Sequence, residues 1–431
     1  MENLKNPETI KKENIGDKIK SVLLDNIVVI IFVILCLIGV ELSQMTWGFI
    51  MNELVARLAR NLFLVLSLII PVVAGMGLNF SIVIGAMAAQ IALITVTHWG
   101  ITGLSGLLVT TAITIPLAIV FGYLTGVILN KTRGQEMIAG MILGFFTNGL
   151  YQFLFLFLVG TLIVINNPTL ILSTGVGVKN TVDLAGMKYS LDHALNFIPF
   201  FKNLTFVKAT IGISFVMLLV SVYLFYKAKK ENRTDKYSSI ITKIVVYAAL
   251  AGIFVAISTQ KTLINNIKFP AATFMMVGLI CLFTWFIMKT KMGQDFRTVG
   301  QDMHIAEVSG INVSKTRIRA IVISTVLAGI GQIIFMQNMG ILNTYGGHEQ
   351  VGMYAIAAIV VGGASVSRAT IGQAILGTAL FHTLFIVSPQ AGKNIFGDAQ
   401  IGEYFRVFVS YGVIGLSLAL YAWKQVKEKK S

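Results

Sequence analysis

Charged residues are scarce in this sequence. Only 12% of its 431 residues are Asp, Glu, Lys or Arg, whereas 55% are hydrophobic. A soluble domain of ordinary composition has about 25% charged residues. The apolar residues also come in runs of about twenty, the length that spans the hydrocarbon core of a bilayer. The sequence therefore excludes an ordinary soluble domain. It predicts an all-α, polytopic integral membrane protein with about 10 transmembrane helices, taken from about 10–12 apolar segments.

Acidic residues are the scarcer of the two charged classes, 19 against 34 Lys and Arg, which gives a net charge of +15. Such a balance often indicates a nucleic-acid partner. Here, however, the basic residues lie between the apolar runs, and such clusters mark the cytoplasmic ends of membrane spans. The pattern therefore predicts no nucleic-acid partner and places both termini in the cytoplasm. The basic clusters are at residues 131–133, 227–236, 289–319 and 424–430.

Residues for catalysis or metal binding are also lacking. The only cysteines, Cys36 and Cys281, lie in apolar runs and suit small core residues better than a disulfide or a metal pair. The five histidines have no metal-ligand spacing. No phosphate-binding loop ending in Gly-Lys-Ser/Thr occurs, so the chain is not expected to hydrolyse ATP by that route. No paired acids or Ser-His-Asp set indicates hydrolysis, and the sequence predicts a protein that is not itself an enzyme.

Apolar and polar segments divide the chain into three parts. Residues 1–25 form a polar N-terminal lead, 26–423 a transmembrane domain, and 424–431 a basic tail. Within the domain, residues 166–203 predict an external loop. Residues 52–60, which include Arg57 and Arg60, suggest an interfacial segment. The apolar stretches 62–75 and 81–97 are short for spans, and this length favours a broken or re-entrant element.

A polar island at residues 289–319 interrupts the apolar chain and nevertheless has helical periodicity. Its apolar residues recur on one face. Gly300 allows a break, and Asp302 fits the N-cap of a short helix at residues 303–309. Gly310 suits the position just past its C-terminus, and Ser314 is expected to cap the next span. The alternative is an ordinary charged loop that happens to be helical. The residues on the shared face are Phe296, Val299, Met303, Ala306 and Gly310.

The run from Arg297 to Val313 resembles the coupling-helix signature of bacterial ABC-importer permeases. The closest branch is the ribose, simple-sugar and nucleoside group, which is related to the branched-chain amino-acid permeases. The signature is roughly R-A-V-G-x-N-x-x-A-A-x-x-x-G-I-x-V. Thr298, Asp302 and Ile305 depart from it, and Asp serves as well as Asn at an N-cap. The matching residues are Arg297, Val299, Gly300, Ala306, Gly310, Ile311 and Val313.

Two Gly- and Ala-rich segments extend the resemblance. Residues 356–365, IAAIVVGGAS, are similar to a family element, but Ser367-Arg368-Ala369 replaces glycines found in many relatives. Residues 77–81, GLNFS, lie where sugar permeases often have G-I-D-L-S. Asn79 in place of Asp weakens a sugar assignment and leaves nucleosides and branched-chain amino acids open. Two longer Gly- and Ala-rich elements, residues 77–90 and 352–363, have a similar placement in the two halves, which suggests an internal duplication; the alternative is that Gly and Ala are simply frequent in membrane helices.

The resemblance implies a permease subunit of an ATP-driven importer in the bacterial cytoplasmic (inner) membrane. Its implied partners are a separate ATP-binding subunit that holds ATP and Mg, an extracytoplasmic substrate-binding protein, a second permease copy or a homologous permease, and membrane lipid. No cofactor is expected in this chain. The residues expected to couple it to the ATPase are Gly293, Arg297, Gly300, Asp302, Ala306, Glu307 and Gly310.

Neutral amides inside the apolar runs are the candidates for a substrate path. Such groups need partners in lipid and should face the bundle interior, although hydrogen bonds that merely hold helices together explain each of them equally well. They favour a small uncharged solute such as a simple sugar or nucleoside. Charges within spans are nearly missing, which argues against an ion-coupled secondary transporter. That transporter, a passive channel and a membrane scaffold remain the alternatives. The candidates are Asn79, Gln90, Asn148, Gln152, Gln332, Gln337 and Asn338.

Overall fold

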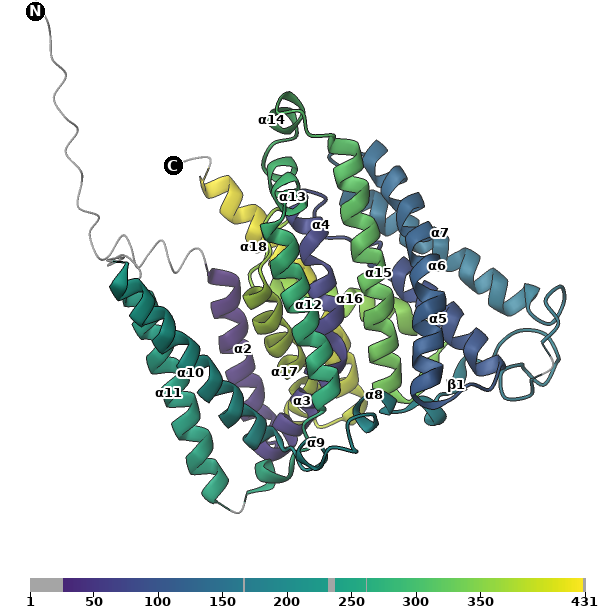
Figure 1. The fold of residues 1–431 in the computed structure, drawn as a ribbon. Coiled ribbons are helices and arrows are strands. Elements are labelled where there is room, and N and C mark those ends of the chain that lie inside the picture. Colours follow the sequence, from purple (N-terminus) through teal and green to yellow (C-terminus); the bar gives the residue numbers. More distant parts are fainter. Residues whose placement is uncertain (1–25, 166, 232–236, 261, 429–431) are drawn as a thin grey trace, which may run out of the picture.

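The computed structural model describes residues 26–165, 167–231, 237–260 and 262–428. The predicted N-terminal lead, residues 1–25, and part of the basic loop at 227–236 lie outside them. The chain is a bundle of helices that run between two ends (Figure 1). One end carries the small helix α14, and the other carries a two-stranded sheet of β1 (Thr181–Asp183) and β2 (Ile341–Asn343). These are called the α14 end and the sheet end below.

The order of the helices follows the apolar runs of the sequence. Eight helical stretches are long and apolar enough to cross a membrane, and two shorter apolar helices accompany them, so the predicted fold class is confirmed. Among the described residues the long or membrane-buried elements are α2 (Ile27–Ser43), α3 (Trp47–Ser67), α4 (Ile69–Val73), α5 (Ile82–His98), α6 (Gly103–Lys131), α7 (Glu136–Phe153) with its π-helical extension (Leu154–Leu158), α10 (Phe206–Lys230), α11 (Tyr237–Thr259), α12 (Ala271–Lys289), α15 (Val313–Met339), α16 (Gly347–Val361), α17 (Ile371–Phe396) and α18 (Ala399–Glu428).

Two similar units interlock at the centre of the bundle. Each has a long helix, a connection, a shorter helix and a second long helix: α3–α4, α5 and α6 in one unit, and α15, α16 and α17 in the other. The first helix of each unit packs against the other two helices of the opposite unit. The internal duplication itself stays a prediction.

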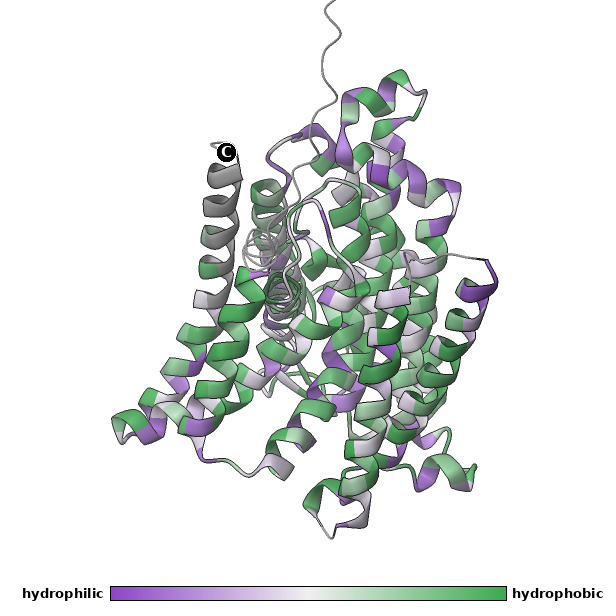
Figure 2. Cartoon of the chain, turned by 90° about the vertical axis from the view of Figure 1, so that its left-hand side faces the viewer, coloured by the Kyte–Doolittle hydropathy of each residue, from purple (hydrophilic) through white to green (hydrophobic). Residues whose placement is uncertain are grey.

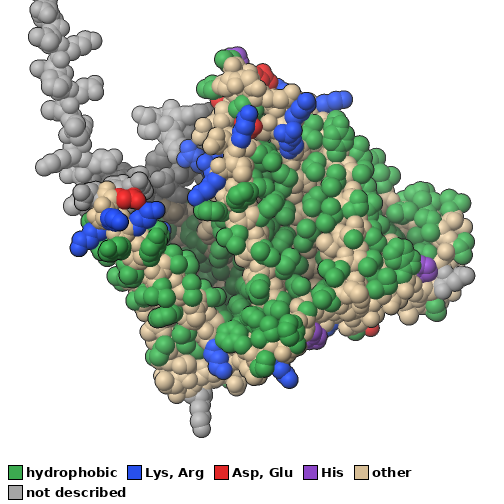
Figure 3. All heavy atoms as spheres, viewed as in Figure 1, with side chains coloured by type: hydrophobic (Ala, Val, Ile, Leu, Met, Phe, Trp, Pro, Cys, Tyr) green, Lys and Arg blue, Asp and Glu red, His purple; other side chains and the backbone are tan. Residues whose placement is uncertain are grey.

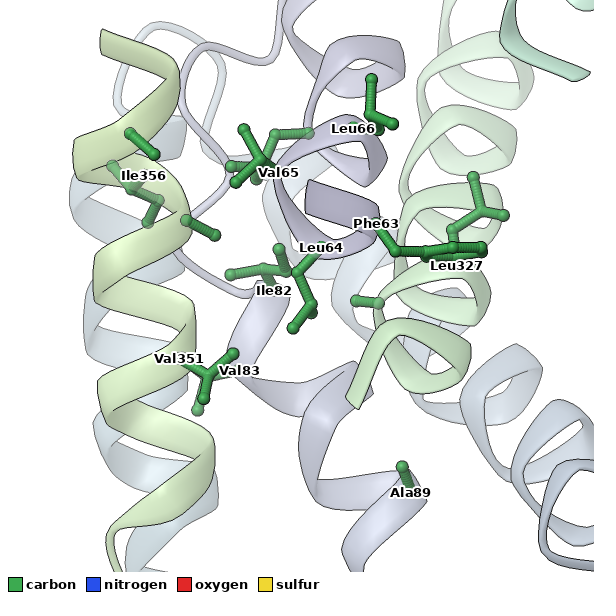
Figure 4. Close-up of a cluster of buried hydrophobic side chains, with 14 of the residues drawn as sticks. Phe63, Leu64, Val65, Leu66, Ile82, Val83, Ala89, Leu327, Val351 and Ile356 are labelled. Atoms are coloured by element: carbon green, nitrogen blue, oxygen red, sulfur yellow. The ribbon is translucent and has the colours of Figure 1, made fainter. Parts of the chain in front are cut away.

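The core fills the space between these units with apolar side chains. In Figure 4, Phe63 lies beside Leu327 of α15, and Val83 of α5 lies beside Val351 of α16. Gly85 lets α5 approach α15 closely, since a Cβ at this position would lie 2.9 Å from Cβ of Ala328. Small residues at helix contacts are the expected means of packing in a membrane.

The outer helices face an apolar environment. α10 and α11 form a hairpin at the side of the bundle, and none of the described residues of α11 is buried. Hydrophobic side chains cover the flank, while Lys and Arg gather near the α14 end (Figure 3). Figure 2 shows hydrophilic residues on the segment that projects there. This distribution is that of a multi-pass membrane protein.

Several boundaries differ from the sequence prediction. Residues 52–60 do not form a separate segment: they belong to a continuous helical stretch, Trp47–Val73, that also includes most of 62–75, and their interfacial position stays a prediction. Arg57 and Arg60 therefore lie on a helix that is long and apolar enough to cross a membrane. The loop 166–203 contains β1 and the short helices α8 (Ser190–His193) and α9 (Pro199–Lys202). The first residues of the predicted tail continue α18.

Candidate functional site

The polar island folds into two short helices, α13 (Lys291–Gln301) and α14 (Met303–Val308), between α12 and α15. As predicted, Asp302 caps α14, because its carboxylate accepts hydrogen bonds from the backbone N–H groups of His304 (2.7 Å) and Ile305 (3.0 Å). Ser314 does not cap the next span. That role belongs to Asn312, whose side chain accepts a bond from the Lys315 N–H at 2.9 Å.

One face of this segment is held by the rest of the chain. Phe296 of α13 is fully buried in the main core, and Val299 and Ala306 form a small cluster with Val313 at the start of α15. α13 also packs on α4, α12 and α15. The two short helices are therefore fixed to the ends of three long elements. We call residues 290–312 the coupling segment.

The glycines of the coupling segment serve contacts within the chain. A Cβ at Gly300 would overlap the carbonyl oxygen of Val73, and one at Gly293 would overlap that of Ile287. Ala306 is likewise buried within the chain. The chain's own elements therefore fill the space beside Gly300 and Ala306. Gly310 differs, since nothing lies within 4 Å of its Cβ position.

The exposed face of the coupling segment combines polar and apolar groups. Arg297 donates a hydrogen bond to the carbonyl oxygen of Met288 at 2.8 Å. Glu307 lies 3.4 Å from Arg133 of the α6–α7 connection. Ile305 is 58% exposed and Val308 77% exposed at the tip. The sequence analysis did not include these two side chains among the contact residues, although two apolar residues in a short polar helix indicate a contact surface.

A buried ion pair joins α15 to α7 beside the coupling segment, and the sequence did not predict it. Arg317 of α15 is fully buried, and its guanidinium donates to the Glu136 carboxylate. Its Nε–H points at the sulfur of Met76 (2.8 Å), and Nη1 lies 3.4 Å from the sulfur of Met303 in α14. A single arginine thus joins α7, α14, α15 and the connection after α4.

Gly310 provides a direct test of the connection between α14 and α15. Its φ of +79° lies in the left-handed region, which asparagine tolerates and β-branched residues do not. We expect Gly310→Val to destabilise this connection by about 1–2 kcal/mol and Gly310→Asn to cost much less. Hydrogen exchange of residues 303–312 measures the difference. Equal exchange rates in the two variants would contradict this account.

The predicted path amides do not form one group. Asn79 lies in the turn before α5, where its oxygen accepts from the N–H (3.2 Å) and hydroxyl of Ser81 while its amide nitrogen lies 3.4 Å from the Ser324 hydroxyl oxygen. Gln152 is half-buried on α7. Gln332 and Gln337 of α15 are buried, and neither amide has a hydrogen-bond partner among the described residues.

Gln90 and Asn148 meet through a residue that was not among the predicted path amides. His348 of α16 lies between them, with ring Nδ1 2.8 Å from the Gln90 side-chain oxygen and Nε2 2.9 Å from the Asn148 side-chain oxygen. His348 is fully buried.

Asn338 lines the larger of two hollows. Near the sheet end, a cavity of about 800 Å³ lies between α3, α8, α12 and α15. A smaller crevice of about 420 Å³ near the α14 end lies between α4, α12, the coupling segment and the start of α17. Both follow the seam where α3–α4 packs on α12. The polar side chains of the cavity include Asn52, Glu53, Arg60, Asp192, His193, Asn196, Lys202, Asn266, Lys268 and Asn338.

Both carboxylates of the cavity already have partners. Asp192 accepts from the backbone N–H (3.1 Å) and hydroxyl (2.7 Å) of Thr273, and Glu53 lies 3.6 Å from Arg57. Among the described residues no group of three or more His, Cys, Asp or Glu could hold a metal ion. The side chains left to meet a ligand are therefore chiefly amides and cations.

Comparisons with known proteins give a consistent result. A family model described as branched-chain amino acid transport system / permease component matches residues 197–418, more than half of the chain. The chain is 28% identical over 155 residues to the nucleoside ABC transporter permease protein NupC of Lactococcus lactis, covering 35% of this chain and 46% of NupC.

Two further relatives show the same kind of partial match. The xylose transport system permease protein XylH of Haemophilus influenzae is 26% identical over 166 residues, 38% of this chain and 41% of XylH. The high-affinity branched-chain amino acid transport system permease protein LivH of Escherichia coli is 35% identical over 97 residues, 22% of this chain and 31% of LivH. The matches thus span less than half the length of these relatives. No solved structure matches.

Proposed function

Since the chain belongs to the family of permease components of branched-chain amino acid transport systems, we propose that it is the membrane-spanning subunit of an ATP-driven importer. It translocates a small uncharged solute by alternating access and carries out no covalent chemistry. The observation that carries this proposal is the coupling segment. It is a rigid pair of short helices that displays an exposed tip and is fixed to α4, α12 and α15.

The α14 end faces the cytoplasm in this proposal. The described basic residues at that end include Lys131, Arg133, Lys227, Lys289 and Lys315, and such clusters are retained on the cytoplasmic side during insertion. A separate ATPase, which binds ATP and Mg, docks there, and the substrate-binding protein delivers solute to the sheet end. A second permease copy or a homologous permease completes the transmembrane part.

The contacts of the coupling segment explain how it transmits movement. Because Phe296 and Val299 are buried and Arg317 bonds to Glu136, a push on α14 moves the ends of α12 and α15 together with α7. Packed interfaces of this kind have discrete arrangements and do not deform continuously. Gly310→Val is therefore also expected to lower the transport-stimulated ATPase activity of the assembled complex.

The proposed route follows the seam between α3–α4 and α12. The cavity at the sheet end and the crevice at the α14 end lie at opposite ends of this seam, which places a hollow toward each side of the proposed route. The unpartnered amides of Gln332 and Gln337 lie on α15, which packs against α3. Amides without partners are suited to hydrogen-bond hydroxyl groups of a passing solute.

Simple sugars and nucleosides fit this lining best. Amides at the cavity can bond to hydroxyls, and Tyr189 and Phe269 offer apolar ring faces. NupC and XylH carry a nucleoside and xylose in their names. A zwitterionic amino acid is the second candidate, because the cavity also carries cations. Its ammonium group would need a free carboxylate, however, and Asp192 and Glu53 are both engaged.

The test is purification of the tagged chain from native membranes in mild detergent, with identification of the proteins that accompany it. We expect an ATP-binding subunit and an extracytoplasmic binding protein, and the latter is then screened with a nucleoside, a pentose and leucine. Recovery without an ATPase in several detergents, together with solute uptake driven by an ion gradient alone, would overturn the proposal in favour of a secondary transporter.

A further inference from the structure

His348 is placed between two hydrogen-bond acceptors. Its Nδ1 faces the side-chain oxygen of Gln90 and its Nε2 faces that of Asn148. A neutral imidazole has only one N–H and cannot donate to both. Turning either amide by 180°, which exchanges its oxygen and nitrogen, would relieve the conflict. The other hydrogen-bond partners of the two amides therefore decide how the amides are oriented and how many protons the cluster holds.

The orientation of Gln90 is fixed by two further bonds. Its amide nitrogen donates to the backbone oxygen of Asn343 at 3.2 Å, and its oxygen accepts from the Tyr151 hydroxyl at 3.0 Å. Reversal would lose the first bond and place the amide nitrogen against Nδ1. The oxygen of Gln90 therefore faces His348, and Nδ1 carries a proton.

Asn148 has Glu349 on its other side, and both of its orientations lead to the same proton count. As built, the Asn148 amide nitrogen donates to the Glu349 carboxylate, and its oxygen requires a proton on Nε2. When reversed, the nitrogen donates to an unprotonated Nε2, and the oxygen then needs a proton from the Glu349 carboxyl. The first arrangement is imidazolium with carboxylate, and the second is neutral imidazole with carboxylic acid.

We propose that Glu349, Asn148 and His348 form a proton-binding site that holds one proton, shared across the asparagine. Both arrangements are electrically neutral, which makes burial beside apolar core much less costly than burial of a lone charge. The site lies near the sheet end and joins α5, α7 and α16. Glu349 is only half-buried, so protons exchange with the solution on that side.

Few other titratable groups face this site. On α7, the Tyr151 ring lies 4.9 Å from the His348 ring, and its hydroxyl is bonded to Gln90. Tyr345, in the turn before α16, directs its hydroxyl to the backbone oxygen of Val178 at 2.6 Å. The α5 side contributes only the Gln90 amide. Glu349 is therefore the acidic group to which the site responds.

Loss of the proton breaks one bond of the cluster. The Glu349 carboxylate and the unprotonated ring nitrogen of His348 then both need a hydrogen-bond donor. Asn148 lies between these two acceptors and has only one NH₂ group to donate. The proton-bound form thus has one more hydrogen bond, and the free energy of unfolding falls as pH rises and the proton is lost. Since the contact joins α7 to α16, we expect the sheet end to loosen at alkaline pH.

Glu349→Gln provides the decisive variant. A glutamine side chain can donate to the Asn148 oxygen as the carboxylic acid does, so this variant fixes the proton-bound arrangement at every pH. Thermal unfolding of the full-length chain in detergent, between about pH 5 and 9, should show a fall of roughly 3 °C for the wild type and none for Glu349→Gln. Glu41→Gln, at an exposed carboxylate on α2, should follow the wild type.

Two results would overturn the proposal. One is a parallel pH dependence in the wild type and Glu349→Gln, and the other is a Glu349→Gln chain that is less stable than the wild type at every pH. If the proton stays bound over the whole pH range of the unfolding experiment, the wild type shows no pH dependence, and spectroscopy then detects the proton directly. A protonated-carboxyl infrared band lost in Glu349→Gln, or a doubly protonated ¹⁵N-histidine signal lost in His348→Phe, then supports the site. The absence of both signals refutes it.

Discussion

Replacing Arg317 with alanine is expected to destabilise the folded chain by about 3–5 kcal/mol, because the change leaves the Glu136 carboxylate without its partner. The Glu136 side chain is only 10% exposed, so water cannot fully replace the guanidinium. The same change removes the N–H groups that face the sulfurs of Met76 and Met303. Detergent-titrated unfolding of the purified chain measures the loss.

The matched control removes both charges at once. In Arg317→Met with Glu136→Leu, neither charge remains buried, and such replacements of a buried pair are often close to neutral. We therefore expect the double variant to be clearly more stable than Arg317→Ala. Glu136→Gln separates charge from hydrogen bonding, because an amide oxygen still accepts from the guanidinium. Equal destabilisation by Arg317→Ala and the double variant would contradict this account, because it would show that the ion pair itself stabilises the fold and that the unpaired Glu136 carboxylate adds no further cost.

The local geometry of the coupling segment could be predicted from the sequence because its signals are short-range. Asp302 caps the helix that begins at the next residue, and Gly310 has the positive φ that ends it. A cap depends on a few consecutive residues and little else. The error at the next helix is of the same kind, since Asn312 and Ser314 are both good caps and only the start of α15 distinguishes them.

The continuation of a single helix through residues 52–60 has a tertiary cause. Two arginines in nine residues indicate the end of a span, and hydropathy alone gives no reason to continue the helix through them. In the fold, the Arg57 guanidinium lies 4.7 Å from the centroid of the Phe385 ring on α17, and Arg60 lies 3.0 Å from the sulfur of Met339. These partners are more than 270 residues away along the chain.

The intramembrane polar residues show the same limit. Composition identified Gln90 and Asn148 as buried amides, but not that His348 joins them or that Glu349 completes the set. Equally, nothing local distinguishes Asn79, whose side-chain oxygen accepts from the Ser81 N–H, from Gln332, whose amide has no partner among the described residues. Spacing along one helix predicts which face is buried. The partner across the helix interface depends on the packing of the whole bundle.

The exposed tip of α14 leads to the second large effect. Ile305 is 58% exposed and Val308 is 77% exposed. Replacing both residues, Ile305→Asp with Val308→Asp, puts two carboxylates on this apolar tip. If the ATPase covers this tip when it docks at the α14 end, burying two unpaired charges costs several kcal/mol. We expect stimulated ATPase activity and solute uptake to fall by at least about tenfold, the change that 1.4 kcal/mol produces.

The fold of the permease should not change, because neither side chain belongs to the core and Ala306, the buried residue of α14, is kept. Conservative exchange of the pair, Ile305→Val with Val308→Ile, retains an apolar tip and should retain coupling. The unfolding midpoint of each variant serves as the measure of structural integrity. A charged tip that keeps full coupling would place the ATPase contact elsewhere on the α14 end, with the Arg133–Glu307 pair as the nearest alternative surface.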